Sequence, residues 1–420
     1  MKLPRGGGFR RLVQLGAPAR FRPFAPFRHD QAAQSSPTAG LPRRPAWGTL
    51  VHNHGFEREN LELNCATEIL PTHNATLFQA AVRRAAAALR AGELVALPTE
   101  TVYGLAANAL DAAAVARIFA AKERPAHNPV IVHVADLAMA RQCAASWPDA
   151  ATALARAFWP GPLTLVLPRS AAIPDAVTAG GPTVGIRWPS HPFIQAVIRE
   201  CGFPLAAPSA NPANRVSPTN ATHVLKSLGG RVRLVVDGGQ SQVGIESTVV
   251  DLTSRPARVL RPGMISEAAI RSVIPAVFAA DTSGETVAPA AALRSPGQLP
   301  RHYSPSARLE IRAWRDEADL RAQLVTLGVS PTAVHVLAHT VIPLGPGFGS
   351  VSVIPHDAEA FARALYGELH QCDAAGAELI VIEAIPGTDE WQAIADRLKR
   401  AAMSDLTTKA ESGTLPIPCN

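Results

Sequence analysis

Apolar residues recur at helical and strand-like spacings between about residues 76 and 403. They share one helical face from Leu77 to Leu89, and Gly92 ends that helix. The apolar run 94–97 predicts a strand, which leads directly into the hydroxyl-rich loop 98–104. A polar loop that follows a strand of an α/β sheet is a common place for a ligand.

The next stretch repeats this arrangement with basic residues. Asp111 is the predicted N-cap of an alanine-rich helix that ends near Lys122. A loop with Arg124 and Asn128 follows, and a second apolar run ends at His133. The order strand, polar loop, helix, basic loop and strand therefore brings two polar loops to the ends of predicted strands.

Further strands and helices are predicted as far as about residue 275. The predicted strands are 163–167, 183–187, 234–237, 247–251 and 258–261, and the predicted helices are 137–145, 150–158 and 192–200. Another helix is predicted to begin with Ser217 as its N-cap and Pro218 at its first position.

The second half of the chain begins with a change of composition. Residues 279–307 are rich in Pro, Gly, Ser and Ala, as linkers are, but the run SPGQLPRHYSP at 295–305 holds an Arg, a His and a Tyr together. From 308 onward strands at 309–311, 334–337 and 379–382 alternate with helices at 315–327, 357–375 and 388–402. This alternation predicts a small, Rossmann-like parallel α/β domain over 308–420.

Composition limits the class of protein. The 420 residues are enough for two domains, and 47% hydrophobic with 18% charged residues is typical of a soluble globular chain. No run of about 18 apolar residues occurs, so we expect no membrane span. The five cysteines have neither metal nor redox spacing, which favours the reducing cytoplasm.

Residues 1–75 differ from the rest of the chain. Seven basic residues precede the first acidic one, Asp30, and no periodicity persists. We expect a disordered basic extension, with an upstream start codon, an organelle transit peptide and an RNA-binding arm left open as interpretations. Because part of the net charge of +6 lies in this segment, the charge indicates nucleic acid only weakly.

The residues that could carry chemistry are cations and hydroxyls at predicted strand ends. The sequence has no P-loop, no GxGxxG at a strand–helix turn, and no HExxH or CxxC motif. Lys122, Arg124 and Asn128 share one short loop, and a guanidinium fork with an ammonium suits a polyphosphate. The same loop is also compatible with a lysine that only complements the helix dipole and a solvated arginine.

Two further groups are candidates. Thr99, Thr101, His133 and Arg187 could hold a small amino acid, with Arg187 on its carboxylate, although turn and backbone contacts would also explain them. Ser209, Asn211, Ser217 and Arg261 form the third group. A helix that starts at Ser217 could receive an anion or a ribose hydroxyl, and ordinary helix capping is the alternative.

Seven segments taken together resemble a known family, the YrdC-like threonylcarbamoyl-AMP synthases. In order they are PTETVYGL, KERPxxNPVIVH, TVGIRWPxHP, APSANPANRVSPT, VDGG, GIESTVVDL and VLRPG. The resemblance is strong over about 76–275 and looser over about 290–403, and it indicates the long form with two domains. It implies a catalytic domain over 76–278 with a twisted, mixed and mostly parallel sheet around a concave basic cavity, and a linker or lid over 279–307.

The resemblance also implies an activity. Such an enzyme makes L-threonylcarbamoyladenylate from L-threonine, bicarbonate and ATP, with Mg²⁺ bridging the phosphates, and releases pyrophosphate. The product supplies a tRNA threonylcarbamoyl transferase complex, and contact with tRNA itself is possible. Such a protein is cytoplasmic and needs no membrane.

Site residues follow from the resemblance by position. Threonine would be held by Thr101, His133, Arg187, Ala207 and Ser247. The nucleotide would be held by Arg124, Asn128, Thr183, Ser209, Ser217, Arg261 and Tyr303. Lys122 and Arg124 would carry catalysis near the phosphates, and the protein itself would supply no metal ligand.

Two other functions compete with this interpretation. A basic concave face could bind tRNA or double-stranded RNA without catalysis, although aromatic residues make up only 5% of the chain. Carbamoyl transfer to another acceptor, as in hydrogenase-maturation relatives, would require acylphosphatase and zinc-finger segments, which the sequence lacks.

Overall fold

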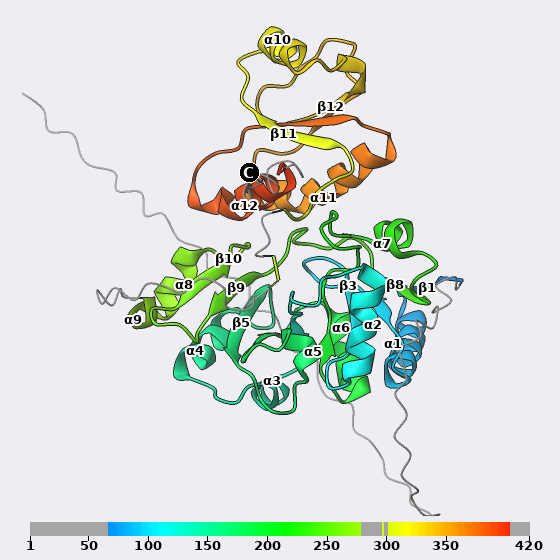
Figure 1. Cartoon of the computed structure of the whole chain (residues 1–420), viewed down its shortest axis with the longest axis vertical. Helices are drawn as coiled ribbons and strands as arrows, with labels where there is room; N and C mark the ends of the chain where they lie inside the picture. The colour runs from blue at the N-terminus through cyan, green and yellow to red at the C-terminus, as the bar shows by residue number, and fades with distance from the viewer. Residues whose placement is uncertain (1–65, 279–295, 298–300, 404–420) are drawn as a thin grey trace, which may run out of the picture. The chain divides into compact units, whose positions relative to one another are not determined.

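A computed structural model describes residues 66–278, 296–297 and 301–403 (Figure 1). The strands form two separate sheets. The first has ten strands in the order β1-β8-β2-β3-β7-β4-β6-β5-β9-β10, and the second has four in the order β11-β14-β12-β13. The predicted α/β class is confirmed. None of the described helices has the length and apolar character needed to cross a membrane.

The elements alternate along most of the chain. Those of the first sheet and its helices are β1 (Glu68–Pro71), α1 (Ala75–Arg90), β2 (Val95–Leu97), β3 (Gly104–Asn108), α2 (Ala112–Lys122), β4 (Val132–His133), α3 (Leu137–Cys143), α4 (Asp149–Phe158), β5 (Leu163–Pro168), α5 (Asp175–Thr178), β6 (Thr183–Arg187), α6 (Pro192–Cys201), β7 (Leu205–Ala206), α7 (Ala221–Leu228), β8 (Leu234–Asp237), β9 (Thr248–Asp251), β10 (Arg258–Arg261), α8 (Glu267–Val273) and α9 (Pro275–Phe278). Those of the second are β11 (Arg308–Arg312), α10 (Glu317–Leu327), β12 (Val334–Ala338), β13 (Ser350–Val353), α11 (Ala358–Ala374), β14 (Leu379–Glu383) and α12 (Gln392–Ala401).

The first sheet is mixed. Among its described strands, the pairs β1–β8, β2–β8, β4–β6 and β5–β9 are parallel, and the other five pairs are antiparallel. The expectation of a mostly parallel sheet is therefore wrong. The sharp turn through the loop at 98–103 returns β3 antiparallel to β2, so a crossover helix is not needed there.

Helices cover both faces of this sheet. Successive residues of a strand point to opposite faces, and in β8 Val235 belongs to one apolar core while Leu234 and Val236 belong to another. Helices α1 and α6 pack in the second of these cores, and α2, α4 and α7 pack in the first. The loops that join strands to helices are thereby fixed at the sheet's edge.

Local capping explains where the helix before the basic loop begins and ends. The Asp111 carboxylate accepts hydrogen bonds from the backbone N–H groups of Ala113 and Ala114, as predicted. Glu123 ends α2 in the left-handed conformation, with φ of 52°. The chain turns sharply there and enters the loop that carries Arg124.

Three sequence predictions need correction. Helix α7 begins at Ala221 with Asn220 as its N-cap, so Ser217 is not a cap and Pro218 is not a first helical residue. Strand β1 lies inside the predicted extension 1–75, where Ile69 and its neighbours pair with β8. The rest of that extension, 1–65, lies outside the described residues. Strands β3, β7 and β13 were not predicted.

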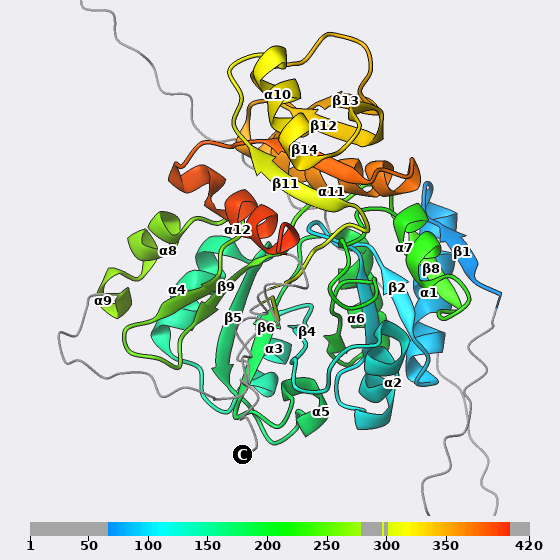
Figure 2. The same ribbon diagram turned by 45° about the horizontal axis from the view of Figure 1, so that its top comes forward.

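The C-terminal domain is a parallel sheet with helices on both faces (Figure 2). Helices α11 and α12 pack with Ile380 and Ile382 on one face, and α10 packs with Leu379 and Val381 on the other. The first of these cores also takes in apolar residues from the half with the first sheet and from the linker, namely Val102, Val216, Ile245 and Tyr303. The two halves of the chain therefore share one apolar core.

Candidate functional site

A polar cavity lies where the loops after β2 and β7, the ends of β4 and β6 and the start of β9 meet. The space between its lining residues is about 520 Å³ when the part open to solvent is included. Its lining consists of Thr99, Thr101, Val102, Gly104, Arg124, Ile131, His133, Arg187, Ala207, Pro208, Ser209, Glu246, Ser247, Arg261, Pro296 and His302. Three arginines against one glutamate give this lining a positive formal charge, as anionic substrates require.

The structure brings all five predicted threonine-binding residues to this one cavity. Strands β4 and β6 are parallel neighbours, and their register pairs His133 directly with Arg187. The Ala207 N–H donates to the Ile131 carbonyl just before β4, at 3.1 Å. Sheet pairing thus places side chains that are far apart in sequence on one wall.

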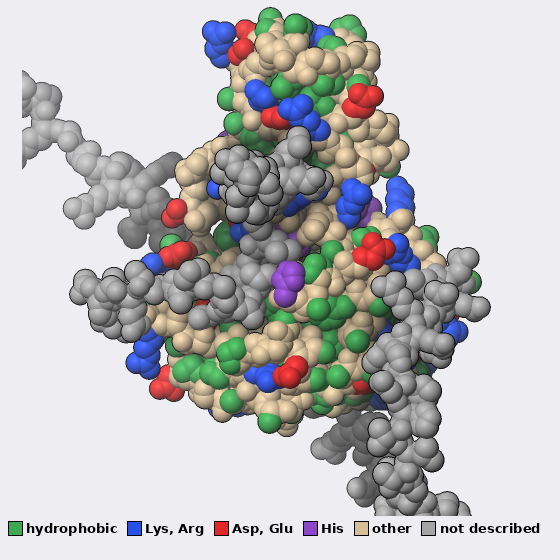
Figure 3. Space-filling model, in the orientation of Figure 1, with side chains coloured by type: hydrophobic (Ala, Val, Ile, Leu, Met, Phe, Trp, Pro, Cys, Tyr) green, Lys and Arg blue, Asp and Glu red, His purple; other side chains and the backbone are tan. Residues whose placement is uncertain are grey.

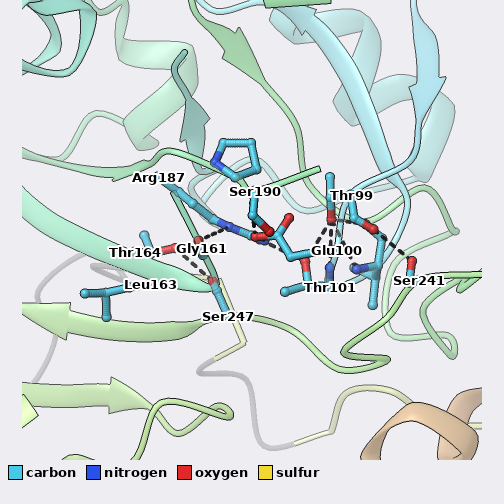
Figure 4. A network of polar contacts seen from close by, with 12 residues as sticks. Thr99, Glu100, Thr101, Gly161, Leu163, Thr164, Arg187, Ser190, Ser241 and Ser247 are labelled. Carbon is cyan, nitrogen blue, oxygen red and sulfur yellow. Dashed lines mark hydrogen bonds and ion pairs between the residues drawn. The ribbon is translucent and has the colours of Figure 1, made fainter. Parts of the chain in front are cut away.

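Arg187 is the centre of a buried polar network (Figure 4). Its Nη1 donates to Thr101 Oγ1 at 2.9 Å, and its Nε donates to the Gly161 carbonyl at 3.3 Å. Its Nη2 forms an ion pair of 2.8 Å with Glu100 Oε1. Burial opposes ionisation of Glu100, but the Arg187 charge and the hydrogen bonds from Arg187 and the backbone together outweigh it, so the pKa of that carboxyl lies below its usual value.

Hydroxyl groups extend this network in both directions. Thr99 Oγ1 lies 2.9 Å from Thr101 Oγ1 and donates to the Val102 carbonyl at 2.6 Å. On the other side, Ser247 Oγ lies 2.8 Å from Thr164 Oγ1. These contacts fix the hydroxyl-bearing wall without any ligand.

His133 is buried, and among the described residues its Nδ1 has no hydrogen-bond partner. Burial, with the nearby Arg187 charge adding to it, lowers the pKa of His133 to about 3. The imidazole is therefore neutral at physiological pH. A buried ring nitrogen without a partner that faces a cavity can bond to a ligand's polar group.

Arg124 is held by its own loop. Its Nε donates to the Asn128 carbonyl at 3.0 Å, and its Nη2 donates to Asn128 Oδ1 at 2.6 Å and to the Pro129 carbonyl at 2.8 Å. Burial lowers the pKa of Arg124 to about 10, so the guanidinium remains charged. Nη1 takes no part in these bonds and can meet an anion in the cavity.

Lys122 lies beside the cavity rather than in its lining. Its ammonium donates to the Ser209 carbonyl at 2.5 Å and also to the Asn211 carbonyl. Burial, reinforced by Arg124, places the pKa of Lys122 well below its usual value. The lysine joins α2 to the loop after β7, so it braces the wall that carries Ser209.

The remaining predicted nucleotide residues are distributed around the cavity. Ser209 and Arg261 line it, and Arg261 Nη2 donates to Ser247 Oγ at 3.1 Å. Asn128 and Ser217 contact lining residues, since Ser217 Oγ donates to Glu246 Oε1 at 2.6 Å. Thr183 begins β6, at the opposite end of that strand from Arg187.

The described linker residues reach the same cavity. Pro296 and His302 belong to its lining, and the Pro296 carbonyl accepts from Arg261 Nη1 at 3.5 Å. Tyr303 is fully buried with φ of 61°, and its hydroxyl has no hydrogen-bond partner among the described residues. Residues 279–295 and 298–300 of the predicted linker lie outside the described part of the chain.

Two carboxylates were missed by the sequence reasoning. Glu100 and Glu246 are both buried beside arginines, and Glu246 lines the cavity. Each lies within a segment that carries the family resemblance, directly before Thr101 and Ser247. The sequence offered one signal for both: each glutamate directly precedes a hydroxyl residue that was predicted to bind threonine.

Two family models match the chain. A family model for Sua5, YciO and YrdC proteins, described as telomere recombination, matches residues 87–263. A second model, for the C-terminal domain of threonylcarbamoyl-AMP synthase, matches residues 265–403.

Individual relatives match both halves. The threonylcarbamoyl-AMP synthases of Pyrococcus abyssi and Bacillus subtilis are each 40% identical, over 76% of this chain and 94% and 92% of their own lengths. A crystal structure of P. abyssi Sua5 complexed with L-threonine matches with a TM-score of 0.70 and 37% identity, covering 80% of this chain and 98% of that one. The chain belongs to the threonylcarbamoyl-AMP synthase family.

Proposed function

We propose that this protein makes L-threonylcarbamoyladenylate from L-threonine, bicarbonate and ATP and releases pyrophosphate. One observation carries the proposal. The five residues assigned to threonine line the same cavity as Arg124, Ser209 and Arg261, which are assigned to the nucleotide. Side chains suited to an amino acid and side chains suited to a triphosphate thus line one space, and proximity of this kind removes much of a bimolecular barrier.

Threonine would lie against the Arg187 network. A guanidinium has five N–H groups, and the contacts to Thr101, Gly161 and Glu100 use three of them. The other two can meet the substrate carboxylate, while His133 Nδ1 and the Ser247 hydroxyl offer uncharged partners for its other polar groups. Because Glu100 partly balances Arg187, the guanidinium is held in position before the substrate arrives.

The chemical step needs positioning and positive charge. The threonine amine attacks the carbon of bicarbonate, water leaves, and a carbamate forms. A carbamate oxygen then attacks the α-phosphorus of ATP, and the bond to the pyrophosphate oxygen breaks. Negative charge accumulates on phosphate oxygens, so Arg124 and Arg261 stabilise the transition state. Lys122 supports this arrangement by holding the loop that carries Ser209.

Mg²⁺ would be carried by the triphosphate. Among the described residues, no group of three or more His, Cys, Asp or Glu side chains is arranged to hold a metal ion. The carboxylate in the cavity lining, Glu246, is already engaged by Ser217, Tyr366 and Arg397. When bound, the ion neutralises phosphate charge and orients the leaving group.

The linker would cover the reacting atoms. Carbamate is short-lived in water, so excluding water protects it. Pro296 and His302 already form part of the cavity wall, and Tyr303 lies beneath them in the shared apolar core. The reactive product then passes to a tRNA threonylcarbamoyl transferase, which completes the modification of tRNA.

The proposal is tested with purified protein, ATP, bicarbonate and L-threonine. Pyrophosphate release should require threonine, and mass spectrometry should identify threonylcarbamoyladenylate. Release of pyrophosphate at the same rate without threonine would contradict the assignment.

The competing function, RNA binding without catalysis, has less support. On the face shown in Figure 3, Lys and Arg side chains are interspersed with Asp and Glu over the described residues. The arginines that line the cavity are buried and hold precise side-chain contacts. Salt-sensitive RNA binding with no consumption of ATP would favour this function instead.

A further inference from the structure

Arg397 on helix α12 crosses from the C-terminal domain to the wall of the cavity. Its side chain is fully buried. Its Nε donates to Glu246 Oε2 at 2.8 Å, and its Nη2 donates to the Glu246 carbonyl at 3.4 Å. Asp396 fixes the third nitrogen, because Nη1 donates to Asp396 Oδ2 at 2.7 Å. A contact between residues 151 positions apart thus joins the two halves of the chain.

Glu246 connects this arginine to the predicted binding residues. Its Oε1 accepts from Ser217 Oγ at 2.6 Å, and its Oε2 also accepts from the Tyr366 hydroxyl of α11 at 3.0 Å. Ser247, the next residue, is held by Arg261 and Thr164. One carboxylate therefore receives two bonds from the C-terminal domain and one from a residue assigned to the nucleotide.

The contact between Arg397 and Glu246 compensates a negative charge in the cavity lining. The cavity must accept a triphosphate and an amino-acid carboxylate, yet Glu246 places a negative charge in its lining. Burial opposes that charge, but the charges of Arg397 and Arg261 together with the hydrogen bonds from Ser217 and Arg397 outweigh the burial and hold the pKa of Glu246 below its usual value. The Arg397 guanidinium offsets the repulsion of anions by Glu246 and leaves the carboxylate able to accept from Ser217, while Arg400 pairs with Asp396 at 3.0 Å and balances that second carboxylate.

Helix α12 also supports the linker. The His302 N–H donates to the Arg400 carbonyl at 3.3 Å, and the Arg397 guanidinium carbon lies 5.0 Å from the centre of the Tyr303 ring. Cation–π contact at this distance is attractive, more so away from water. The same turn of helix thereby holds Glu246 on one side of the cavity and the linker residues on another.

We propose that Arg397, in the C-terminal domain, is a positioning residue for ATP in threonylcarbamoyladenylate synthesis, acting through Glu246, Ser217 and the linker residues His302 and Tyr303. The inference rests on the proposed function of the cavity. It gives the C-terminal domain a defined role, which is to complete the nucleotide side of a site that the first sheet builds only in part. Arg397 touches no reacting atom, so its removal should act on binding more than on chemistry.

The test is steady-state kinetics on full-length Arg397→Met, Arg397→Lys and Tyr366→Phe, with Lys399→Met as the control. Lys399 lies on the same helix but is exposed, so its loss removes a charge and leaves Glu246 untouched. Arg397→Met should raise the KM for ATP at least about tenfold while threonine affinity, measured by calorimetry, changes less than about threefold. Arg397→Lys should recover part of the loss, because it restores the charge but not the fork.

A further variant separates this role from plain stability. Glu246→Gln combined with Arg397→Met removes the repelling charge and should lower the KM for ATP again relative to Arg397→Met alone.

Tyr366→Phe provides a second test if Arg397→Met fails to fold. It removes only the hydroxyl that donates to Glu246, and it should raise the KM for ATP severalfold. The proposal is overturned if folded Arg397→Met has unchanged ATP kinetics. It is also overturned if the two single variants Tyr366→Phe and Arg397→Lys both leave the ATP kinetics unchanged. Wild-type protein without threonine-dependent pyrophosphate release would instead refute the proposed function.

Discussion

The side of the cavity that we propose for threonine (the threonine wall) and the side that we propose for the nucleotide (the nucleotide wall) differ in what holds them. The threonine wall, formed by Thr101, His133, Arg187, Ala207 and Ser247, comes mainly from strand ends of the first sheet. The nucleotide wall consists of Arg124, Ser209 and Arg261 in the lining, with Ser217 and Tyr303 outside the lining. It comes mainly from loops and the linker, and Arg261 lies at the end of a strand.

This difference has a physical consequence. Sheet pairing aligns His133 with Arg187, and the other contacts of the threonine wall also lie within the first sheet and its loops. The nucleotide wall depends in addition on the C-terminal domain, through the contact from Glu246 to Arg397. Amino-acid binding should therefore tolerate changes in the C-terminal domain that ATP binding does not.

The largest effect should come from Arg187→Met, which breaks the threonine wall. Threonine-dependent pyrophosphate release should fall by roughly 100-fold, because a charged contact is lost and Thr101 loses its donor. Stability should also fall by about 3–5 kcal/mol, since Glu100 is left buried without its partner.

A double variant separates these two losses. Glu100→Gln together with Arg187→Met removes the stranded charge, so the unfolding midpoint should recover while activity stays low. Recovery of activity along with stability would show that Arg187 serves only the fold.

Arg124→Ala should have the next largest effect, and on the nucleotide wall. Turnover should fall at least about tenfold, because a charge-assisted contact to phosphate is worth about 1.5–3 kcal/mol. Arg117→Ala is the matched control, since Arg117 lies on α2 and is exposed. Equal activity of the two variants would remove Arg124 from the site.

A fall in pH should lower the free energy of unfolding, because two histidines that line the cavity are buried and neutral. The pKa values of His133 and His302 are about 3 because burial disfavours the imidazolium, against about 6.5 in the unfolded chain. As the pH falls below about 6.5, the unfolded state takes up protons that the native state does not, so the free energy of unfolding decreases. Between pH 7 and 5 the loss should be roughly 2 kcal/mol for each imidazole.

Urea unfolding at several pH values measures this loss. The carboxylates with lowered pKa, Glu100 and Glu246, contribute stability that is lost only below about pH 4.5, so they do not oppose the trend above pH 5. His133→Gln should flatten the slope, whereas replacing the exposed His127 should not. Stability that is constant from pH 7 to 5 would show that the two imidazoles are not buried and neutral.

The smallest effect should come from Tyr303→Phe. The hydroxyl is buried without a partner among the described residues, so its removal should change the free energy of unfolding by less than about 1 kcal/mol. If the hydroxyl meets ATP, the KM for ATP should rise a few fold while that for threonine stays constant. An unchanged KM for ATP would take the hydroxyl out of the nucleotide wall.

Much of the fold and of the threonine wall could be predicted from the sequence because their signals are local. Asp111 caps α2 as expected, and the runs ending at His133 and Arg187 become paired strands. Local rules could not choose the start of α7, since Ser217 and Asn220 are both good caps. The long-range bond from Ser217 to Glu246 leaves the cap to Asn220.

Other features had no local signal at all. Strand β1 is a short edge strand with one buried residue, Leu70, so it carries no alternation to detect. The contact of Arg397 with Glu246 spans the linker and an entire second sheet. Buried charges paired over such separations follow from the folded topology and not from spacing.

The measurement that tests the central claim most directly is the product formed by the purified full-length protein. With ATP, bicarbonate and L-threonine present, we expect one pyrophosphate for each threonylcarbamoyladenylate identified by mass spectrometry, and neither product when threonine is omitted. Pyrophosphate without the adenylate, or release that ignores threonine, would contradict a cavity that joins an amino acid to a nucleotide.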